Sequence, residues 1–539
     1  MLYQLSYLAA GPIVSAEGPG ASVACLAMRK LSILCAVLGI LLIAGCGGSS
    51  SGSDAESSLD NALGYLPADA PFVVSIDTDT KGEQYRAARG ILDRFAFGDQ
   101  IEKAITDELD EDGDFERIED ALGNEFVVGS TDVRAFVNVP SGEDRSFVGA
   151  IQASSEDAID KLLKEEKAEE DGEASGAKLY KDDSGDSFAV EGDVLVVAGS
   201  KKELERALEL RDGDDRMTEE DFDAGTEGVP QDALLRVYLD IGALLRSGGE
   251  AKQALKSKWV EALRTGGIAL AFEQDKVAID FDVKTDPEGL TDADVPIATG
   301  ATSPQVLERD GEIGVALRDL AHVLRFARAT AKSIDADGSA NFDNSIAQIE
   351  AQLDVDLEKD LLSQLGDDVA VTVGLDGKFG ARAQLDDPAK VERTLTKLST
   401  VLSRLAEGAT DERVGFAKPK PGEDFYALAT ADGQRFVFGV VDDFFVISND
   451  ATIAGSLAAA RTAAVSGAKG ALVLRADAEQ LGEEVLKQLE GDLIESTGFE
   501  LGDRIRGAIV TRPLDELTGS IEASTEGLSG SFELTVDPK

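Results

Sequence analysis

Alternation of apolar and polar residues marks two related strands, one in the middle of the chain and one at its end. Val277, Ile279, Phe281 and Val283 alternate with polar residues or alanine, which predicts an antiparallel strand with one face buried. The segment 532–536 repeats the pattern with Phe, Leu and Val at every second position. A shorter continuous apolar run, 194–198, is typical of a strand at the centre of a sheet.

Helix start signals follow several of these strands. Ser200 and Glu203 have the spacing of a capping box and precede the apolar positions of a predicted helix. Asp450 stands at the corresponding place later in the chain, and Asp386 stands where the earlier segment has Ser154. Ser and Asp both accept hydrogen bonds from the free N–H groups of a first helical turn. We therefore expect helix N-caps at these four positions.

The order of these segments predicts an internal duplication. Six segments of the first half recur in the same order in the second, and both series end at Asp-Pro. The matched pairs are 122–125 with 365–368, 147–152 with 379–384, Tyr180 with Tyr426, 188–199 with 436–449, 237–244 with 474–481, and 279–287 with 530–538. We expect two homologous α+β halves, 60–290 and 291–539, each made of antiparallel sheet hairpins packed with helices on one face.

The N-terminal region has the pattern of a lipoprotein signal. Arg29 and Lys30 precede an apolar run that ends in small residues and Cys46. Such a run is too short for a transmembrane helix, which needs about 20 residues. The residues 42–46 resemble a bacterial lipobox, which implies that Cys46 carries a lipid. We expect an upstream extension and signal peptide over 1–45 and a Gly/Ser tether over 46–59. The alternative is an uncleaved N-terminal anchor. Either arrangement predicts a membrane-held protein on the extracytoplasmic side.

Charge and rare residues exclude several classes of function. The chain holds 103 Asp and Glu against 52 Lys and Arg, a balance that repels nucleic acid. The cysteines are Cys25, Cys35 and Cys46, so no disulfide is expected in the mature protein. His322 is the single histidine, which excludes His-rich metal sites.

The chain resembles an uncharacterised family of exported bacterial proteins, the domain of unknown function 3352. The resemblance rests on the lipobox, on Leu66-Pro67-Ala68-Asp69-Ala70-Pro71 followed by the strand 72–77, and on the duplicated α+β body. It implies a similar fold over nearly the whole mature chain, and it brings no catalytic residues, substrate or cofactor.

One acidic segment has the spacing of a calcium-binding loop. The candidate ligands are Glu108, Asp110, Asp112, Asp114 and Glu119, with Gly113 at the sharp turn. Glu at the first position departs from the usual Asp. Since acidic residues are so frequent in this chain, we expect a solvated turn here, with calcium binding as the alternative.

A stripe of basic residues crosses the second half. Arg318, Arg325, Arg328 and Lys332 are expected on one helix face beside His322, and Arg86, Arg89 and Arg94 on the matching helix of the first half. We expect ordinary pairing with carboxylates. The alternative is contact with an anionic ligand or lipid head groups.

Taken together, these patterns favour a lipid-anchored, non-enzymatic protein that binds or scaffolds an unidentified partner or ligand in the cell envelope. Two other hypotheses are open: a carboxylate-dependent hydrolase of the envelope, and a carrier of a lipid or another hydrophobic ligand. Desolvated carboxylates in a cleft would favour the hydrolase, and a large apolar cavity would favour the carrier.

Overall fold

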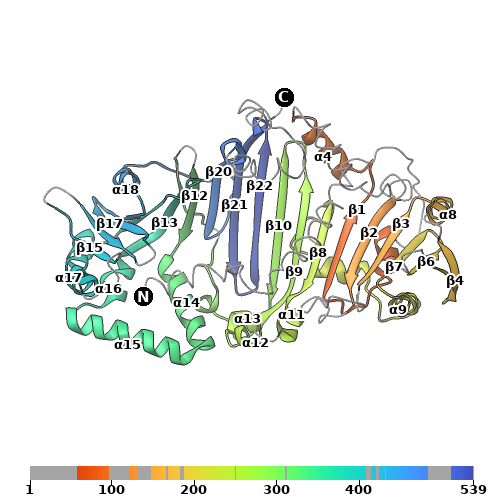
Figure 1. Cartoon of the computed structure of the whole chain (residues 1–539), viewed down its shortest axis with the longest axis horizontal. Coiled ribbons are helices and arrows are strands. Elements are labelled where there is room, and N and C mark those ends of the chain that lie inside the picture. Colours follow the sequence, from red (N-terminus) through yellow and green to blue (C-terminus); the bar gives the residue numbers. More distant parts are fainter. Residues whose placement is uncertain are drawn as a thin grey trace. The chain divides into compact units, whose positions relative to one another are not determined.

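The computed structural model describes residues 57–95, 122–131, 147–165, 168–181, 187–248, 251–300, 302–309, 312–407, 414–420, 424–430, 433–483 and 511–537. In these residues the fold is a mixed α+β arrangement with extensive antiparallel sheet (Figure 1). The chain divides into two compact units, Met1–Gly249 with Thr265–Val277 and Glu250–Arg264 with Ala278–Pro538. The division therefore runs through the segment 250–278. The expected halves, 60–290 and 291–539, are defined by sequence similarity between them, whereas the two units are defined by compactness. The division into homologous halves therefore stays a prediction.

The first unit is built on one antiparallel sheet. Its strands run in the order β4-β5-β6-β7-β3-β2-β1-β8-β9. Their bounds are β1 Phe72–Asp77, β2 Leu122–Ser130, β3 Phe147–Ala153, β4 Glu169–Ala174, β5 Ala177–Lys181, β6 Ser187–Glu191, β7 Val194–Ala198, β8 Leu235–Asp240 and β9 Leu263–Phe272. The expected central strand at 194–198 is thus confirmed as β7, which pairs with β3 and β6.

Helices cover both faces of this sheet. Val194 and Val196 of β7 pack in the main core with Leu204 and Leu208, whereas Leu195 packs with helix residues on the other face, among them Ile159. Three consecutive buried residues require a sheet covered on both sides, because side chains alternate along a strand. The expectation of helices on one face is therefore wrong. The helices are α3 Ser58–Leu63, α4 Glu83–Leu92, α8 Glu156–Glu165, α9 Lys201–Arg211, α10 Glu219–Gly225 and α11 Ile241–Ser247.

The second unit has a sheet with the order β15-β16-β17-β18-β14-β13-β12-β20-β21-β22-β10. The bounds are β10 Lys276–Thr285, β12 Glu312–Arg318, β13 Leu365–Gly374, β14 Phe379–Leu385, β15 Gly415–Ala417, β16 Phe425–Ala429, β17 Arg435–Val441, β18 Phe444–Ser448, β20 Leu472–Asp477, β21 Leu514–Ser524 and β22 Gly527–Val536. A separate small ladder joins β11 Val306–Leu307 to β19 Thr462–Ala463. Both alternating segments found in the sequence are strands, β10 and β22.

The helices of the second unit include one long hairpin. They are α12 Ala251–Ala254, α13 Lys258–Ala262, α14 Leu320–Ile334, α15 Ala336–Leu353, α16 Leu357–Asp360, α17 Pro388–Glu407 and α18 Ala451–Leu457, with short 3₁₀ turns η1 Asp292–Asp294 and η2 Leu362–Gln364. Arg328 of α14 donates to Asp343 of α15 at 3.0 and 2.7 Å, which ties the two helices together. No helix in the described ranges is long and apolar enough to cross a membrane.

Two of the four expected helix caps are confirmed, and two lie one residue away. Ser200 accepts from the Glu203 amide and Asp450 accepts from the amides of Thr452 and Ile453. The Glu203 carboxylate accepts instead from Thr131, so the reciprocal half of the capping box is not made. Ser155 rather than Ser154 accepts from the Ala158 amide, and Asp387 rather than Asp386 accepts from the Lys390 amide. The capping residue of each of these two helices therefore lies one position later than expected.

Candidate functional site

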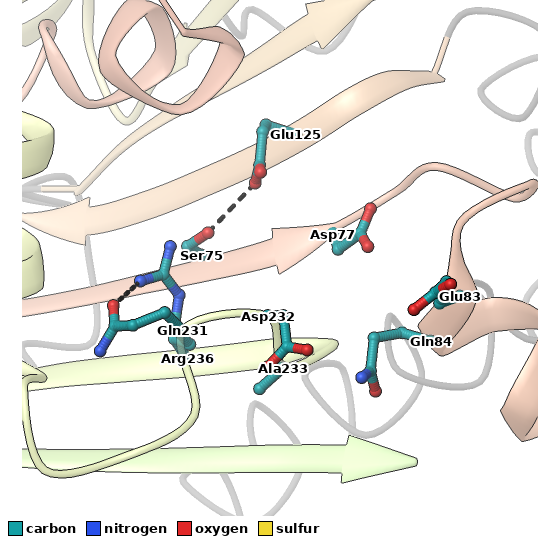
Figure 2. Close-up of a pocket in the computed structure, with 9 residues that line it drawn as sticks. All are labelled: Ser75, Asp77, Glu83, Gln84, Glu125, Gln231, Asp232, Ala233 and Arg236. Carbon is teal, nitrogen blue, oxygen red and sulfur yellow. Dashed lines mark hydrogen bonds between the residues drawn. The ribbon is translucent and has the colours of Figure 1, made fainter. Parts of the chain in front are cut away.

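The first unit contains a small polar pocket where β1, β2 and β8 meet the start of α4 (Figure 2). Its volume is about 250 Å³. Polar and charged side chains dominate the lining, which consists of Ser75, Asp77, Glu83, Gln84, Glu125, Gln231, Asp232, Ala233 and Arg236. The pocket is therefore suited to a small polar ligand.

Strand alternation places four of these residues on one face of the sheet. Ser75 and Asp77 lie two residues apart on β1, and their Cα partners are Arg236 on β8 and Glu125 on β2. Cross-strand partners point to the same face, with Cβ atoms about 5 Å apart. Val73 continues the same face of β1 into the main apolar core. The pocket is thus the polar end of the core of this unit.

Glu125 and Asp77 are two carboxyl groups in a confined space. Burial is the main cause that raises the pKa of Glu125 to about 8, and the nearby negative charge of Asp77 contributes to this shift. The Ser75 hydroxyl donates to Glu125 Oε2 at 3.2 Å, which opposes the shift. Burial also raises the pKa of Asp77, although the Asp79 amide donates to its Oδ1 at 2.8 Å. At neutral pH the pair therefore holds a proton, mainly on Glu125.

Arg236 is the guanidinium of the pocket, and protein groups engage it already. Its side chain is 8% exposed, and Nη1 donates to Asp223 at 2.7 Å and to Gln231 at 2.5 Å. The guanidinium also stacks over the Phe222 ring at 4.9 Å. Asp223 thus offsets the charge of Arg236, and the pocket keeps a negative balance.

A glutamine fixes the far side of the pocket. Gln84, in the first turn of α4, accepts a hydrogen bond from the Phe272 amide of β9 at 2.7 Å. Because this bond holds α4 against the sheet, the wall formed by Glu83 and Gln84 is positioned by β9.

The second unit holds different residues at the corresponding strand positions. Arg318 ends β12 as Asp77 ends β1, and its Cα partner is Asp368. Two residues earlier on β12, Ala316 occupies the position that Ser75 has on β1. Its Cα partner on β20 is Val473, at the position that Arg236 has on β8. Burial and the Asp367 charge raise the pKa of Asp368, while Arg318 lowers it. The pair of facing carboxyls is therefore found in the first unit and not at this place in the second.

The residues singled out from the sequence lie elsewhere. Cys46 and the five candidate calcium ligands, Glu108, Asp110, Asp112, Asp114 and Glu119, fall outside the described residues. Across the ranges that the structure describes, no three His, Cys, Asp or Glu residues come together as a metal-binding group.

The basic stripe is only partly on a helix. Arg325 pairs with Asp319 at 3.7 Å and Glu358 at 3.4 Å, in agreement with ordinary ion pairing. Arg318 lies at the end of β12 instead, and it donates to the carbonyls of Thr299 at 2.8 Å and Gly300 at 2.9 Å. His322 contacts the Val295 carbonyl through Nε2 at 2.8 Å. In the first unit, Arg86 donates to the Gly82 carbonyl and Arg94 to that of Gln274.

The pocket residues escaped the sequence reasoning, although one signal was present. Ser75 and Asp77 are polar at alternate positions of a strand whose other residues are apolar. Such positions on a buried face indicate either a satisfied polar group or a site. Their partners Glu125 and Arg236 come from distant strands, and only the sheet order brings them together.

The chain belongs to the family described as "Protein of unknown function (DUF3352)", which it matches over residues 31–407. The family expected from the sequence is thereby confirmed. No curated protein matches the sequence. Solved structures of TP0453 are similar: crystal form III has a TM-score of 0.25 and 9% identity, covering 45% of this chain and 84% of that one. Crystal form I has a TM-score of 0.24 and 12% identity, covering 41% and 78%. Similarity at this level does not establish a shared fold or function.

Proposed function

We propose that the protein is a lipoprotein held by Cys46 on the extracytoplasmic face of a membrane. The support is the signal pattern of 29–46 and the Gly/Ser tether that follows it. The tether would let the folded units stand clear of the lipid surface. Its partners would be the membrane, through the lipid, and a ligand or protein of the cell envelope.

The biochemical role that we propose is non-enzymatic binding of a small polar ligand by the first unit. The observation that carries it is the pocket whose facing carboxyls, Asp77 and Glu125, sit at the polar end of a packed core. Leaving such groups next to each other has a cost, because each disfavours the ionised form of the other. A bound ligand that pairs with them would offset that cost.

The two units are further proposed to descend from one ancestral half. Their sheets have the same strand order from β4 to β9 and from β15 to β21, and in both the helix after β7 or β18 has its N-cap at the matched residue. The matched sequence segments fall on matching strands. An experimental structure in which these strands did not superpose in one order would contradict common origin.

A hydrolase is the second candidate, and the same pair of carboxyls favours it. A general acid needs a raised pKa near the working pH, which Glu125 has. Binding ranks first because both carboxyl groups already accept hydrogen bonds within the protein. The Ser75 hydroxyl donates to Glu125, and the Asp79 amide donates to Asp77. The pocket gives no support to a lipid carrier, because it is small and its lining is polar.

Analysis of co-purified small molecules tests the binding role. The lipidated protein would be extracted from its own membranes with mild detergent, and the small molecules released on denaturation would be measured by mass spectrometry. We expect a compound that is retained by the wild type and by the control Asp368→Asn, and lost from Asp77→Asn. Equal amounts in all three proteins would contradict binding in the pocket, and turnover of that compound would favour the hydrolase.

A further inference from the structure

We infer that the pocket of the first unit takes a small organic cation, with a primary ammonium group as its recognised part. This inference rests on the proposed binding role and names the ligand class. It follows from the polarity of the pocket, from an unpaired buried acceptor beside it, from its size, and from the contrast with the second unit.

The polarity of the pocket is that of an acceptor site. Four segments of the first unit contribute carboxyl groups to the lining: Asp77 on β1, Glu125 on β2, Glu83 on α4 and Asp232 before β8. The guanidinium of Arg236 is the opposing charge in the lining, and Asp223 and Gln231 accept from it. A ligand in this space therefore meets hydrogen-bond acceptors and a negative potential, which select for a donor with positive charge.

The side-chain carbonyl oxygen of a buried glutamine next to Glu125 accepts no hydrogen bond. Gln152 on β3 is the Cα partner of Glu125, so Asp77, Glu125 and Gln152 form a row across three adjacent strands on one face. Gln152 as a residue is 7% exposed, and its Oε1 has no hydrogen-bond partner. A buried acceptor left unpaired destabilises the folded state, because it has lost its hydrogen bonds to water. An N–H donor bound at Asp77 and Glu125 would lie next to this row, of which Gln152 is the member that does not line the pocket.

The size of the pocket favours an organic cation over a metal ion. A bare ion needs several oxygen ligands at about 2.0–2.6 Å, and the described residues contain no such cluster. The volume of about 250 Å³ is several times the roughly 30 Å³ that one water occupies. A short alkyl amine fits this space, with its ammonium group at the carboxyls and its chain toward Ala233.

The second unit provides an internal comparison. Where the first unit has Asp77, the second has Arg318, and where the first has Glu125, the second has Asp368. A guanidinium at this position would repel an ammonium group. The inference therefore assigns the cation to the first unit alone.

Binding of a cation is coupled to loss of a proton. Burial and, to a smaller extent, the charges of Asp77 and Glu219 raise the pKa of Glu125 to about 8, while Ser75 and Arg236 oppose the shift. Glu83 and Asp232 face the same space from α4 and from the segment before β8. A cation between the carboxyls favours ionised Glu125, so it displaces the proton. Affinity should rise with pH up to about 8, by at most tenfold per pH unit for one proton.

Calorimetric titration of the full chain with 1,4-diaminobutane tests the inference, at pH 6, 7 and 8 in two buffers of different ionisation enthalpy. Matched probes are 1,4-butanediol, calcium chloride and sodium acetate. We expect one saturable site for the diamine, with affinity increasing with pH and with proton release visible as a buffer-dependent heat. Asp77→Asn should weaken binding at least tenfold, Glu125→Gln should remove the pH dependence, and the control Asp368→Asn should leave both unchanged.

The other outcomes overturn the inference in distinguishable ways. Diamine binding that is equal in all variants would show condensation on the acidic surface instead of a site. Saturable binding of the diol or of acetate that is lost in Asp77→Asn would overturn the inference that the ligand is a cation. It would still support the pocket as a binding site. Saturable calcium binding that is lost in Asp77→Asn would show that the pocket binds a metal ion and not an organic cation. No binding of any probe would count against both the cation and the proposed binding role. Thermal unfolding of each variant verifies that it is folded.

Discussion

Asp77 and Glu125 are direct cross-strand partners on β1 and β2, and both line the same pocket. Most sheets avoid like charges in this position, because they destabilise the pair. The corresponding partners in the second unit, Arg318 and Asp368, have opposite charge. The first unit thus retains an unfavourable arrangement that the second does not, which is the pattern expected of a functional site.

Replacing Glu125 changes how stability depends on pH. The ordinary pKa of 4.5 applies in the unfolded chain and about 8 in the folded one, so between these values the folded state alone holds the proton. Stability contributed by this proton is full below pH 4.5 and is lost as pH rises toward 8. We expect Glu125→Gln to be more stable than the wild type at pH 8.5, by up to about 5 kcal/mol, and equal to it at pH 4. Urea denaturation at both pH values measures this. A difference that did not vary with pH would contradict the assignment.

Removing the Arg236 guanidinium should destabilise the first unit. Arg236→Met loses hydrogen bonds to Asp223 and Gln231 in a setting where the side chain is 8% exposed. We expect a loss of about 2–3 kcal/mol in the free energy of unfolding. Arg264→Met is the matched control, since the Arg264–Asp286 pair at 2.9 Å is 44% exposed on both sides, and it should change little. Similar losses in both variants would show that burial of Arg236 is unimportant.

Arg382 has a structural role at the end of α18. It donates to the carbonyls of Leu457 at 2.8 Å, Ala458 at 3.1 Å and Ala460 at 2.8 Å, and it stacks over Phe444 at 4.5 Å. Without it those carbonyls at the helix end lose their donor. Arg382→Met should cost about 2–4 kcal/mol, with faster hydrogen exchange in α18 than in α9. Unchanged exchange in α18 would refute this role.

Membrane attachment should depend on Cys46. Cys46→Ser removes the thiol that the lipobox would lipidate, so the chain should stay uncleaved or be released from the membrane. Fractionation with metabolic labelling by a fatty acid measures both. Cys35→Ser, within the signal, should behave as the wild type. Normal processing and labelling of Cys46→Ser would exclude the lipoprotein assignment.

Calcium should have only a weak effect on the acidic segment. If Glu108, Asp110, Asp112, Asp114 and Glu119 form a solvated turn, millimolar calcium acts on the protein through general screening. The melting temperature should then shift without saturation, and equally in the wild type and Glu119→Gln. A saturable increase abolished by Glu119→Gln would establish the calcium loop instead.

The sequence alone determined the local features of this protein. Alternation identified β10 and β22, the apolar run identified β7, and side-chain chemistry identified the caps at Ser200 and Asp450. These features depend on residues close in the chain, so a linear pattern contains them. Family membership also followed from local motifs.

Only the tertiary structure decided that helices cover both faces of the first unit's sheet, and only it formed the pocket. The pocket needs Asp77, Glu125 and Arg236, and Gln152 lies next to Glu125; these residues come from four strands that are distant in sequence. Their proximity depends on the strand order β3-β2-β1-β8 and on a register that places all four on one face. A shift of register by one residue would turn each strand's residue to the other face. No spacing along the chain encodes that register, because the packing of both sheet faces selects it.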